Sequence, residues 1–175
     1  MYRVNDIFYS LQGEGRNTGR AAVFVRFAGC NLRCPFCDTE FDSFTEMAAE
    51  EIVTEIALKL RPSEGCLLPT ERRESQTSNL KSQTSNLLVV LTGGEPTLQA
   101  DEALVDLLHQ QGYEVAMESN GTRPAPRNLD WLTVSPKNGE GCMVKSEGRL
   151  PDEIKIVFDE NTVPESVLPS PFTPH

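Results

Sequence analysis

The chain has 175 residues, a length that fits one domain with its own hydrophobic core. A net charge of −10 and a pI near 4.7, without a basic run, argue against binding to a phosphate backbone. We therefore expect a small-molecule substrate and no nucleic acid. No apolar run approaches the roughly 18 residues of a membrane span, and the N-terminal stretch lacks the apolar block of a signal peptide. These features predict a cytoplasmic protein with no membrane partner, in which five cysteines serve as ligands or nucleophiles rather than in disulfides.

The first half of the chain predicts one strand followed by one helix. Residues 21–29 alternate between apolar faces and form a strand that leads straight into a group of cysteines. Apolar residues recur from 49 to 60 with the period of an amphipathic helix. Thr45 is the expected N-cap of this helix, and Pro62 is expected to end it.

The second half predicts four more strands and a second helix. The apolar run at 87–92 is typical of a strand buried on both faces, and residues 101–111 read as a helix that Gly112 ends. The remaining strands are expected at 113–119, 131–135 and 153–158. Five strands that alternate with helices or long crossovers predict an α/β fold with a mostly parallel sheet.

Two segments do not follow this pattern. Residues 62–86 are polar and contain the tandem repeat "ESQTSNL" and "KSQTSNL", so we expect a flexible insertion in a single domain that spans 1–175. Residues 160–175 contain four prolines without a helical or strand period, which predicts an irregular tail.

Three cysteines lie within eight residues. Cys30, Cys34 and Cys37 have the spacing C-x3-C-x2-C, and a loop of this kind can wrap around a 4Fe-4S cube so that each thiolate meets a different iron. The fourth iron then has no protein ligand. A structural zinc site would need a fourth Cys or His, for which the sequence offers only poor candidates. These are Cys66, His109, Cys142 and His175.

The cysteine spacing, with Phe36 just before the last cysteine, resembles the signature of the radical S-adenosylmethionine superfamily. "TGGEP" at 92–96 follows a predicted strand and resembles the GGE motif of that superfamily, whose backbone and Glu95 receive the methionine ammonium. "SPK" at 135–137 resembles a further cosubstrate-binding turn. The resemblance implies that S-adenosylmethionine chelates the fourth iron. It also implies a partial, open (βα) barrel with its site at the carboxyl ends of the strands, since a complete barrel needs about 250 residues.

Five short motifs indicate one family within this superfamily. "SLQGEG", "CDT", "LTGGEPTLQ", "ESNG" and "VSPK" together resemble the family of 7-carboxy-7-deazaguanine synthases. This resemblance implies conversion of 6-carboxy-5,6,7,8-tetrahydropterin to 7-carboxy-7-deazaguanine with loss of ammonia, in the biosynthesis of 7-deazapurines such as queuosine. It also implies a homodimer and a flavodoxin-like or other electron donor. A glycyl-radical activating protein and a non-catalytic iron-sulfur or zinc module remain as alternatives.

The resemblance also assigns roles to residues. The cluster and the cosubstrate generate the radical, so no side chain is assigned as catalytic, and Thr39 contributes an oxygen to a magnesium ion. The residues that would bind S-adenosylmethionine are Phe36, Cys37, Asp38, Gly94, Ser135, Pro136 and Lys137. Those that would bind the pterin are Leu11, Gln12, Gly13, Arg26 and Thr92. Without the resemblance, Thr39 would be a turn residue, residues 11–13 a glycine turn and Arg26 a member of a surface salt bridge.

The tail departs from the pattern of that family, which continues past the fifth strand into a further strand and helix. We therefore expect residues 160–175 to leave the substrate side of the site more open than in the family, while the cluster side stays intact. Either pterin turnover is then poor, or a dimer partner supplies the lid.

Overall fold

The computed structural model describes residues 1–37, 39–40, 42–61, 87–137 and 149–157. The expected insertion at 62–86, the tail and Asp38 lie outside the described residues. The described strands are β1 (Tyr2–Leu11), β2 (Ala21–Phe27), β3 (Thr45–Met47), β4 (Leu88–Gly93), β5 (Glu114–Ser119), β6 (Trp131–Val134) and β7 (Glu153–Ile154). The helices are α1 (Ala49–Lys59), the 3-10 turn η2 (Pro96–Leu98) and α3 (Glu102–Gln110).

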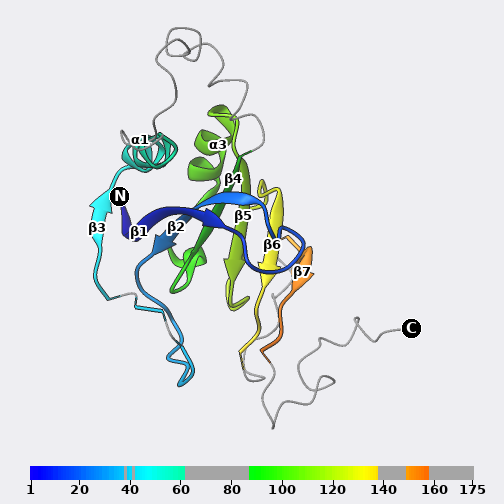
Figure 1. Cartoon of the computed structure of the whole chain (residues 1–175). Coiled ribbons are helices and arrows are strands. Elements are labelled where there is room, and N and C mark those ends of the chain that lie inside the picture. The colour runs from blue at the N-terminus through cyan, green and yellow to red at the C-terminus, as the bar shows by residue number, and fades with distance from the viewer. Residues whose placement is uncertain (38, 41, 62–86, 138–148, 158–175) are drawn as a thin grey trace, which may run out of the picture.

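The seven described strands form one open sheet with the order β3-β1-β2-β4-β5-β6-β7 (Figure 1). From β2 to β7 all neighbouring strands are parallel, whereas β1 is antiparallel to both β2 and β3. The five parallel strands lie where the sequence predicts strands, but in the described part of 153–158 only Glu153–Ile154 form β7. The expected fold class, a partial open barrel with a mostly parallel sheet, is confirmed.

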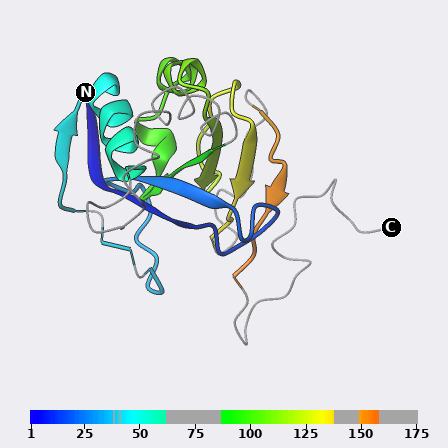
Figure 2. The ribbon, with the colours of Figure 1, turned by 45° about the horizontal axis from the view of Figure 1, so that its top comes forward.

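Helices α1 and α3 cover one face of the sheet (Figure 2). Ile52 and Ile56 of α1 and Leu104 of α3 pack there in a single hydrophobic core with the inward side chains of β2, β4 and β5. The other face carries a smaller buried cluster of Ala22, Leu88, Val90 and Ala116. All side chains from 88 to 91 are fully buried, alternately in the two clusters, which confirms that β4 is buried on both faces.

The start of α1 differs from the prediction. Thr45 is not the N-cap but the first residue of β3, which pairs with β1 at the edge of the sheet. The helix begins after Ala48, whose backbone N–H donates to the Glu51 carboxylate at 2.6 Å. A carboxylate in the first turn thus accepts a hydrogen bond from the backbone N–H of the N-cap residue. The hydroxyl of Thr45 is therefore not needed to cap the helix. The predicted end of α3 is correct, since Gly112 follows its C-cap with φ of 83°.

The loop between β1 and β2 crosses the face that the helices leave open and reaches β7 (Figures 1 and 2). The backbone N–H of Arg16 donates to Glu153 at 3.1 Å, and the Glu14 carboxylate pairs with Lys155 at 2.7 Å. A Cβ on Gly15 would lie 2.1 Å from the flexible carboxylate end of Glu153, which can move aside, but the φ of +66° favours glycine at this crossing. This loop, residues 12–20, closes one side of the open barrel.

Candidate active site

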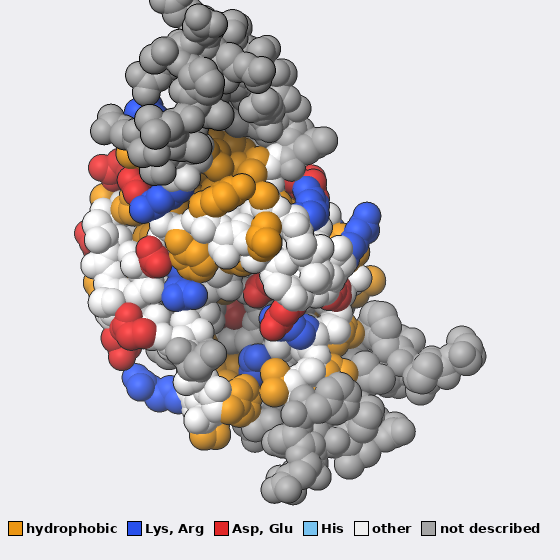
Figure 3. Space-filling model, in the orientation of Figure 1, with side chains coloured by type: hydrophobic (Ala, Val, Ile, Leu, Met, Phe, Trp, Pro, Cys, Tyr) orange, Lys and Arg blue, Asp and Glu red, His pale blue; other side chains and the backbone are white. Residues whose placement is uncertain are grey.

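A cavity of about 860 Å³ lies at the carboxyl ends of the parallel strands, a volume in the range of small-molecule sites. Figure 3 shows charged side chains of both signs in the middle of one face, with hydrophobic side chains above and below them. Ten of the predicted site residues line this cavity. They are Gly13, Cys30, Cys34, Phe36, Cys37, Thr39, Thr92, Gly94, Ser135 and Lys137.

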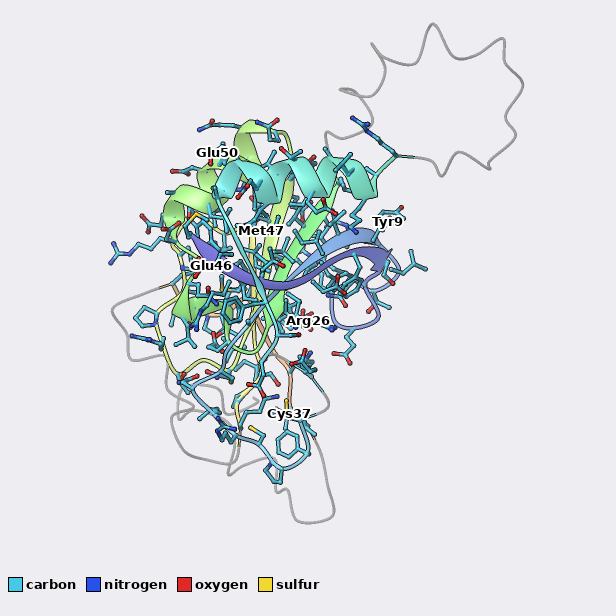
Figure 4. All side chains as sticks on the ribbon, turned by 90° about the vertical axis from the view of Figure 1, so that its left-hand side faces the viewer. Tyr9, Arg26, Cys37, Glu46, Met47 and Glu50 are labelled. Carbon is cyan, nitrogen blue, oxygen red and sulfur yellow. The ribbon has the colours of Figure 1, made fainter. Side chains whose placement is uncertain are left out.

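The cysteine loop follows β2 and extends beyond the end of the sheet, with Cys37 on its far part (Figure 4). Cys30 and Cys34 are half-buried and Cys37 is exposed, and all three are free. Burial raises the pKa of the Cys30 thiol, whose sulfur accepts the backbone N–H of Leu32 at 3.4 Å. Among the described residues, no three His, Cys, Asp or Glu side chains are gathered around a point where one metal ion could bind. All three cysteines line the cavity.

Two glycines dock the end of β4 against the start of this loop. A Cβ on Gly93 would lie 2.3 Å from the carbonyl oxygen of Phe27, and one on Gly94 would lie 2.0 Å from that of Gly29. The backbone N–H groups of Gly94 and Glu95 donate to the same two carbonyls at 3.0 and 2.9 Å. In the structure these glycines allow two strand ends to meet, so the turn and the cysteine loop are fixed relative to each other.

Glu95, which follows β4, forms hydrogen bonds to the end of the neighbouring strand β5. Its side chain is fully buried, and its carboxylate accepts the backbone N–H and hydroxyl of Thr97, the hydroxyl of Ser119 and the backbone N–H of Asn120. These four hydrogen bonds stabilise the negative charge of the buried carboxylate. Glu95 is not on the cavity lining, and its geometry is that of a brace between β4 and β5.

The turn after β6 joins the cysteine loop from the other side. The backbone N–H of Ser135 donates to Ser119 at 2.8 Å, which ties this turn to the end of β5. The Lys137 ammonium donates to the Ser135 hydroxyl at 2.8 Å and lies 5.7 Å from the centre of the Phe36 ring. Pro136 is buried behind the turn and does not line the cavity.

The three residues of the predicted pterin loop lie in different surroundings. Gln12 is only 8% exposed, and its side-chain amide donates to Glu118 of β5 at 2.8 Å. Gly13 lines the cavity, whereas Leu11 is 63% exposed and does not. Gln12 therefore connects the loop to a carboxylate on the cavity wall, and the structure does not bring the Leu11 side chain to the site.

Lys155 was not predicted as a site residue. It lines the cavity between Glu14 at 2.7 Å and Glu118 at 3.6 Å. Burial alone would lower the pKa of Lys155, but the hydrogen bond to Glu14 and the nearby charge of Glu118 outweigh it, so the pKa lies above its ordinary value. The signal in the sequence was a lone lysine inside the apolar run "EIKIVF".

Arg26 lies further back along β2 than the cysteine loop (Figure 4). Its guanidinium is 5.2 Å from the centre of the Phe8 ring, which in turn stacks on Phe24 at 5.1 Å. Val23 and Val25 on the opposite face are fully buried, as the alternation predicts. Arg26 pairs in register with Thr92 of β4, and no ion pair to a described carboxylate is formed.

Comparison with known proteins gives the family. A model of the radical SAM superfamily matches residues 24–133. A 7-carboxy-7-deazaguanine synthase of Bacteroides thetaiotaomicron is 43% identical over 159 residues, which cover 91% of this chain and 71% of the relative. The chain belongs to the 7-carboxy-7-deazaguanine synthase family. Another member, from Nitratidesulfovibrio vulgaris, is 42% identical over 184 residues, covering 98% of this chain and 78% of the relative.

A solved structure agrees with this 7-carboxy-7-deazaguanine synthase assignment. The crystal structure of QueE from Escherichia coli superposes with a TM-score of 0.58 and 28% identity, over 78% of this chain and 60% of that one. The family predicted from the five motifs is therefore confirmed, and with it a radical enzyme of the lyase class whose cofactors include a 4Fe-4S cluster and S-adenosylmethionine. None of the helices in the described part is long and apolar enough to cross a membrane.

Proposed function

We propose that the chain converts 6-carboxy-5,6,7,8-tetrahydropterin to 7-carboxy-7-deazaguanine with loss of ammonia. The observation that carries this proposal is the convergence of three cysteines, the TGG turn and the SPK turn on one cavity, in a chain 43% identical to a named synthase. The product is a precursor of 7-deazapurines such as queuosine. A glycyl-radical activating protein is not favoured, since the curated relatives carry the name of the synthase.

The donor set fits a 4Fe-4S cluster. Cys30, Cys34 and Cys37 supply three thiols to one cavity, and in a 4Fe-4S cube each sulfur would bind a different iron. When bound and reduced, the cluster supplies the electron that cleaves S-adenosylmethionine to methionine and the 5′-deoxyadenosyl radical, which takes hydrogen from C6 of the pterin. The protein then has to position both molecules and exclude water.

The cosubstrate is proposed to lie between the cysteine loop and the turns after β4 and β6. Gly94, Ser135 and Lys137 line the same cavity as Phe36, and the Lys137 ammonium lies 5.7 Å from the centre of the Phe36 ring, which supports this position. Phe36, Cys37 and Asp38 are assigned to the adenosine side. Gly94 and residues 135–137, including the backbone of the buried Pro136, are assigned to the remainder of the cosubstrate.

The pterin is proposed to lie on the loop side of the cavity. Backbone groups of Leu11 and Gly13, the amide of Gln12 and the hydroxyl of Thr92 would bind its polar edges. Gln12 is ordered by its hydrogen bond to Glu118, which places an amide and a carboxylate together at this end. A heterocycle with several donors and acceptors fits such a wall.

Arg26 is proposed to bind the substrate carboxylate. The alternative reading, a surface salt bridge, finds no support, because the described carboxylates form no ion pair with it. The Phe8 ring contacts the guanidinium at 5.2 Å, and a guanidinium is suited to bind a carboxylate with two parallel hydrogen bonds. The neighbouring Thr92 in register on β4 lines the cavity.

Thr39 is proposed to contribute its hydroxyl oxygen to a magnesium ion that also binds the substrate carboxylate. It lines the cavity two residues after Cys37, and a hard cation accepts one neutral protein oxygen when substrate and water complete the octahedron. We further propose that the enzyme is a cytoplasmic homodimer that receives electrons from a flavodoxin-like protein. Size-exclusion chromatography with light scattering tests the dimer, and reduced flavodoxin in place of dithionite tests the donor.

An anaerobic assay tests the proposed function. Purified protein with a reconstituted cluster, 6-carboxytetrahydropterin, S-adenosylmethionine, magnesium and dithionite should form 7-carboxy-7-deazaguanine without another protein. An activating protein would leave the pterin unchanged, and a zinc module would contain zinc instead of about four irons per chain.

A further inference from the structure

Asn120 directly follows β5 and lines the same cavity as Cys30, and it has no role in the reaction described so far. Its side chain is only 7% exposed. Its backbone N–H donates to the buried Glu95 carboxylate at 2.7 Å, so β4 fixes its position. A polar side chain that is buried and firmly held beside a cluster ligand needs an explanation.

The orientation of the Asn120 amide is determined by Thr122. The Oδ1 atom of Asn120 accepts the backbone N–H of Thr122 at 2.9 Å and its hydroxyl at 2.6 Å. Because a backbone N–H can only donate, the atom that faces it must be the amide oxygen. The amide nitrogen therefore points to the other side, toward the cysteine loop.

Two acceptors lie on that side. The Nδ2 atom of Asn120 is 3.0 Å from Oδ1 of Asn31 and 4.0 Å from the sulfur of Cys30. Asn31 is itself held by a hydrogen bond from its amide to the Thr122 hydroxyl at 2.8 Å. The amide has two protons, so one serves Asn31 and the second is directed at the sulfur. The 4.0 Å contact is long for a neutral thiol, and a thiolate attracts the same N–H group more strongly.

We propose that Asn120 donates a hydrogen bond to the Cys30 thiolate and thereby raises the reduction potential of the cluster, an inference that rests on the proposed function. Hydrogen bonds to the ligand sulfurs of a cluster offset the negative charge that reduction adds, so the reduced form is stabilised. The backbone N–H of Leu32, 3.4 Å from the same sulfur, acts in the same direction. Asn120 is the side-chain donor in this arrangement.

The test is an anaerobic redox titration of the reconstituted full chain, followed by electron paramagnetic resonance. Asn120→Asp keeps the shape and both bonds from Thr122 but replaces the donor by an acceptor with a negative charge, so the potential should become more negative. Asn120→Ala should lower it less. Asn128→Ala is the matched control, since that amide donates to Glu102 and Asp106 away from the site, and it should keep the wild-type potential.

Equal potentials in wild type and both Asn120 variants, at full iron content, would overturn the inference. If the Asn120 variants do not retain a cluster, Asn31→Ala decides the question, because it leaves the Asn120 amide only the sulfur as acceptor. The potential should then stay unchanged or rise, and a fall would contradict the inference. A wild-type chain without a four-iron cluster would contradict the proposed function instead.

Discussion

At the scale of single residues, the site depends on atoms that neighbouring strand ends hold in place. The Glu95 carboxylate is fully buried and accepts four hydrogen bonds, from Thr97, Ser119 and Asn120. Cys30, Cys34 and Cys37 could be assigned from sequence because ligand spacing is local. The hydrogen bonds of Glu95 could not be predicted from sequence, because their donors include Ser119 and Asn120 at the end of a different strand.

The ligand assignment predicts different outcomes for the five cysteines. Cys30→Ala, Cys34→Ala and Cys37→Ala should each abolish product formation, since each removes the thiolate of one iron. Cys66→Ala and Cys142→Ala should retain full iron content and turnover. Iron analysis and visible absorbance of the reconstituted proteins check this, and loss of iron from either of the last two would show that the ligand set is wrong.

The magnesium assignment predicts that serine and alanine at position 39 behave differently. Thr39→Ser keeps the hydroxyl and should retain activity, whereas Thr39→Ala should raise the magnesium concentration needed for half-maximal turnover on the order of tenfold, as for a lost ligand. Magnesium titrations of initial rate give the comparison. Identical curves for both variants and wild type would leave Thr39 as a turn residue only.

At the scale of elements, the parallel strands and both helices follow from periodicity, but β1 and β3 do not. The register of β1 shifts between Val4 and Asp6, which interrupts the alternation of inward and outward side chains. The sequence of β1 therefore lacks the regular pattern that predicts a strand. β3 is three residues long and mostly exposed, which leaves it without an apolar signal. Thr45 has the residue type of an N-cap, but pairing with β1 places it in the sheet.

The hydrogen bonds of Glu40, in the segment between Thr39 and β3, predict that the stability of the protein depends on pH. Hydrogen bonds from Ser43, and from the amide of Asn5, lower the pKa of Glu40 from 4.5 to about 2. A lowered folded-state pKa means that this contribution to stability is complete above pH 4.5 and is lost as the pH falls toward 2. The melting temperature of Glu40→Gln should thus lie below that of wild type at pH 7.

The difference should shrink as the pH falls from about 4.5, because wild-type Glu40 then becomes protonated as well. Thermal unfolding of both proteins at a series of pH values measures it. A constant difference for Glu40→Gln over the same range would contradict the interpretation.

At the scale of the whole molecule, the active-site cavity exists because the loop at 12–20 crosses the open side of the sheet. Its contacts join residues far apart in the chain, with Gln12 and Glu118 separated by 106 positions and Glu14 and Lys155 by 141. Periodicity reports only on neighbours, so these pairs could not be predicted from sequence. The family resemblance indicated Gln12 as a site residue, but it did not indicate Lys155, which connects the loop to the end of β7.

This closure predicts a role for Lys155 in pterin binding. Lys155→Met leaves Glu14 and Glu118 without their shared cation, so the Michaelis constant for the pterin should rise on the order of tenfold. Abortive cleavage of S-adenosylmethionine without pterin should stay at the wild-type rate. Lys59→Met, which removes a similar lysine paired with Glu55 at 3.1 Å on α1, should leave both quantities unchanged.

A double variant tests whether Lys155 acts through Glu118. If it does, adding Glu118→Gln to Lys155→Met should change the Michaelis constant by less than the product of the two single effects. Steady-state kinetics of the four proteins provide the comparison. Fully multiplicative effects would mean that the two residues act independently.

In the proposed reaction, the cavity places C6 of 6-carboxytetrahydropterin beside the adenosyl group of S-adenosylmethionine. Pterin that carries deuterium at C6 tests this placement, with the reconstituted enzyme under anaerobic conditions. We expect 7-carboxy-7-deazaguanine together with deuterium in the adenosyl 5′ position, detected by mass spectrometry. Formation of this product without deuterium transfer, or cleavage of the cosubstrate with the pterin unchanged, would contradict it.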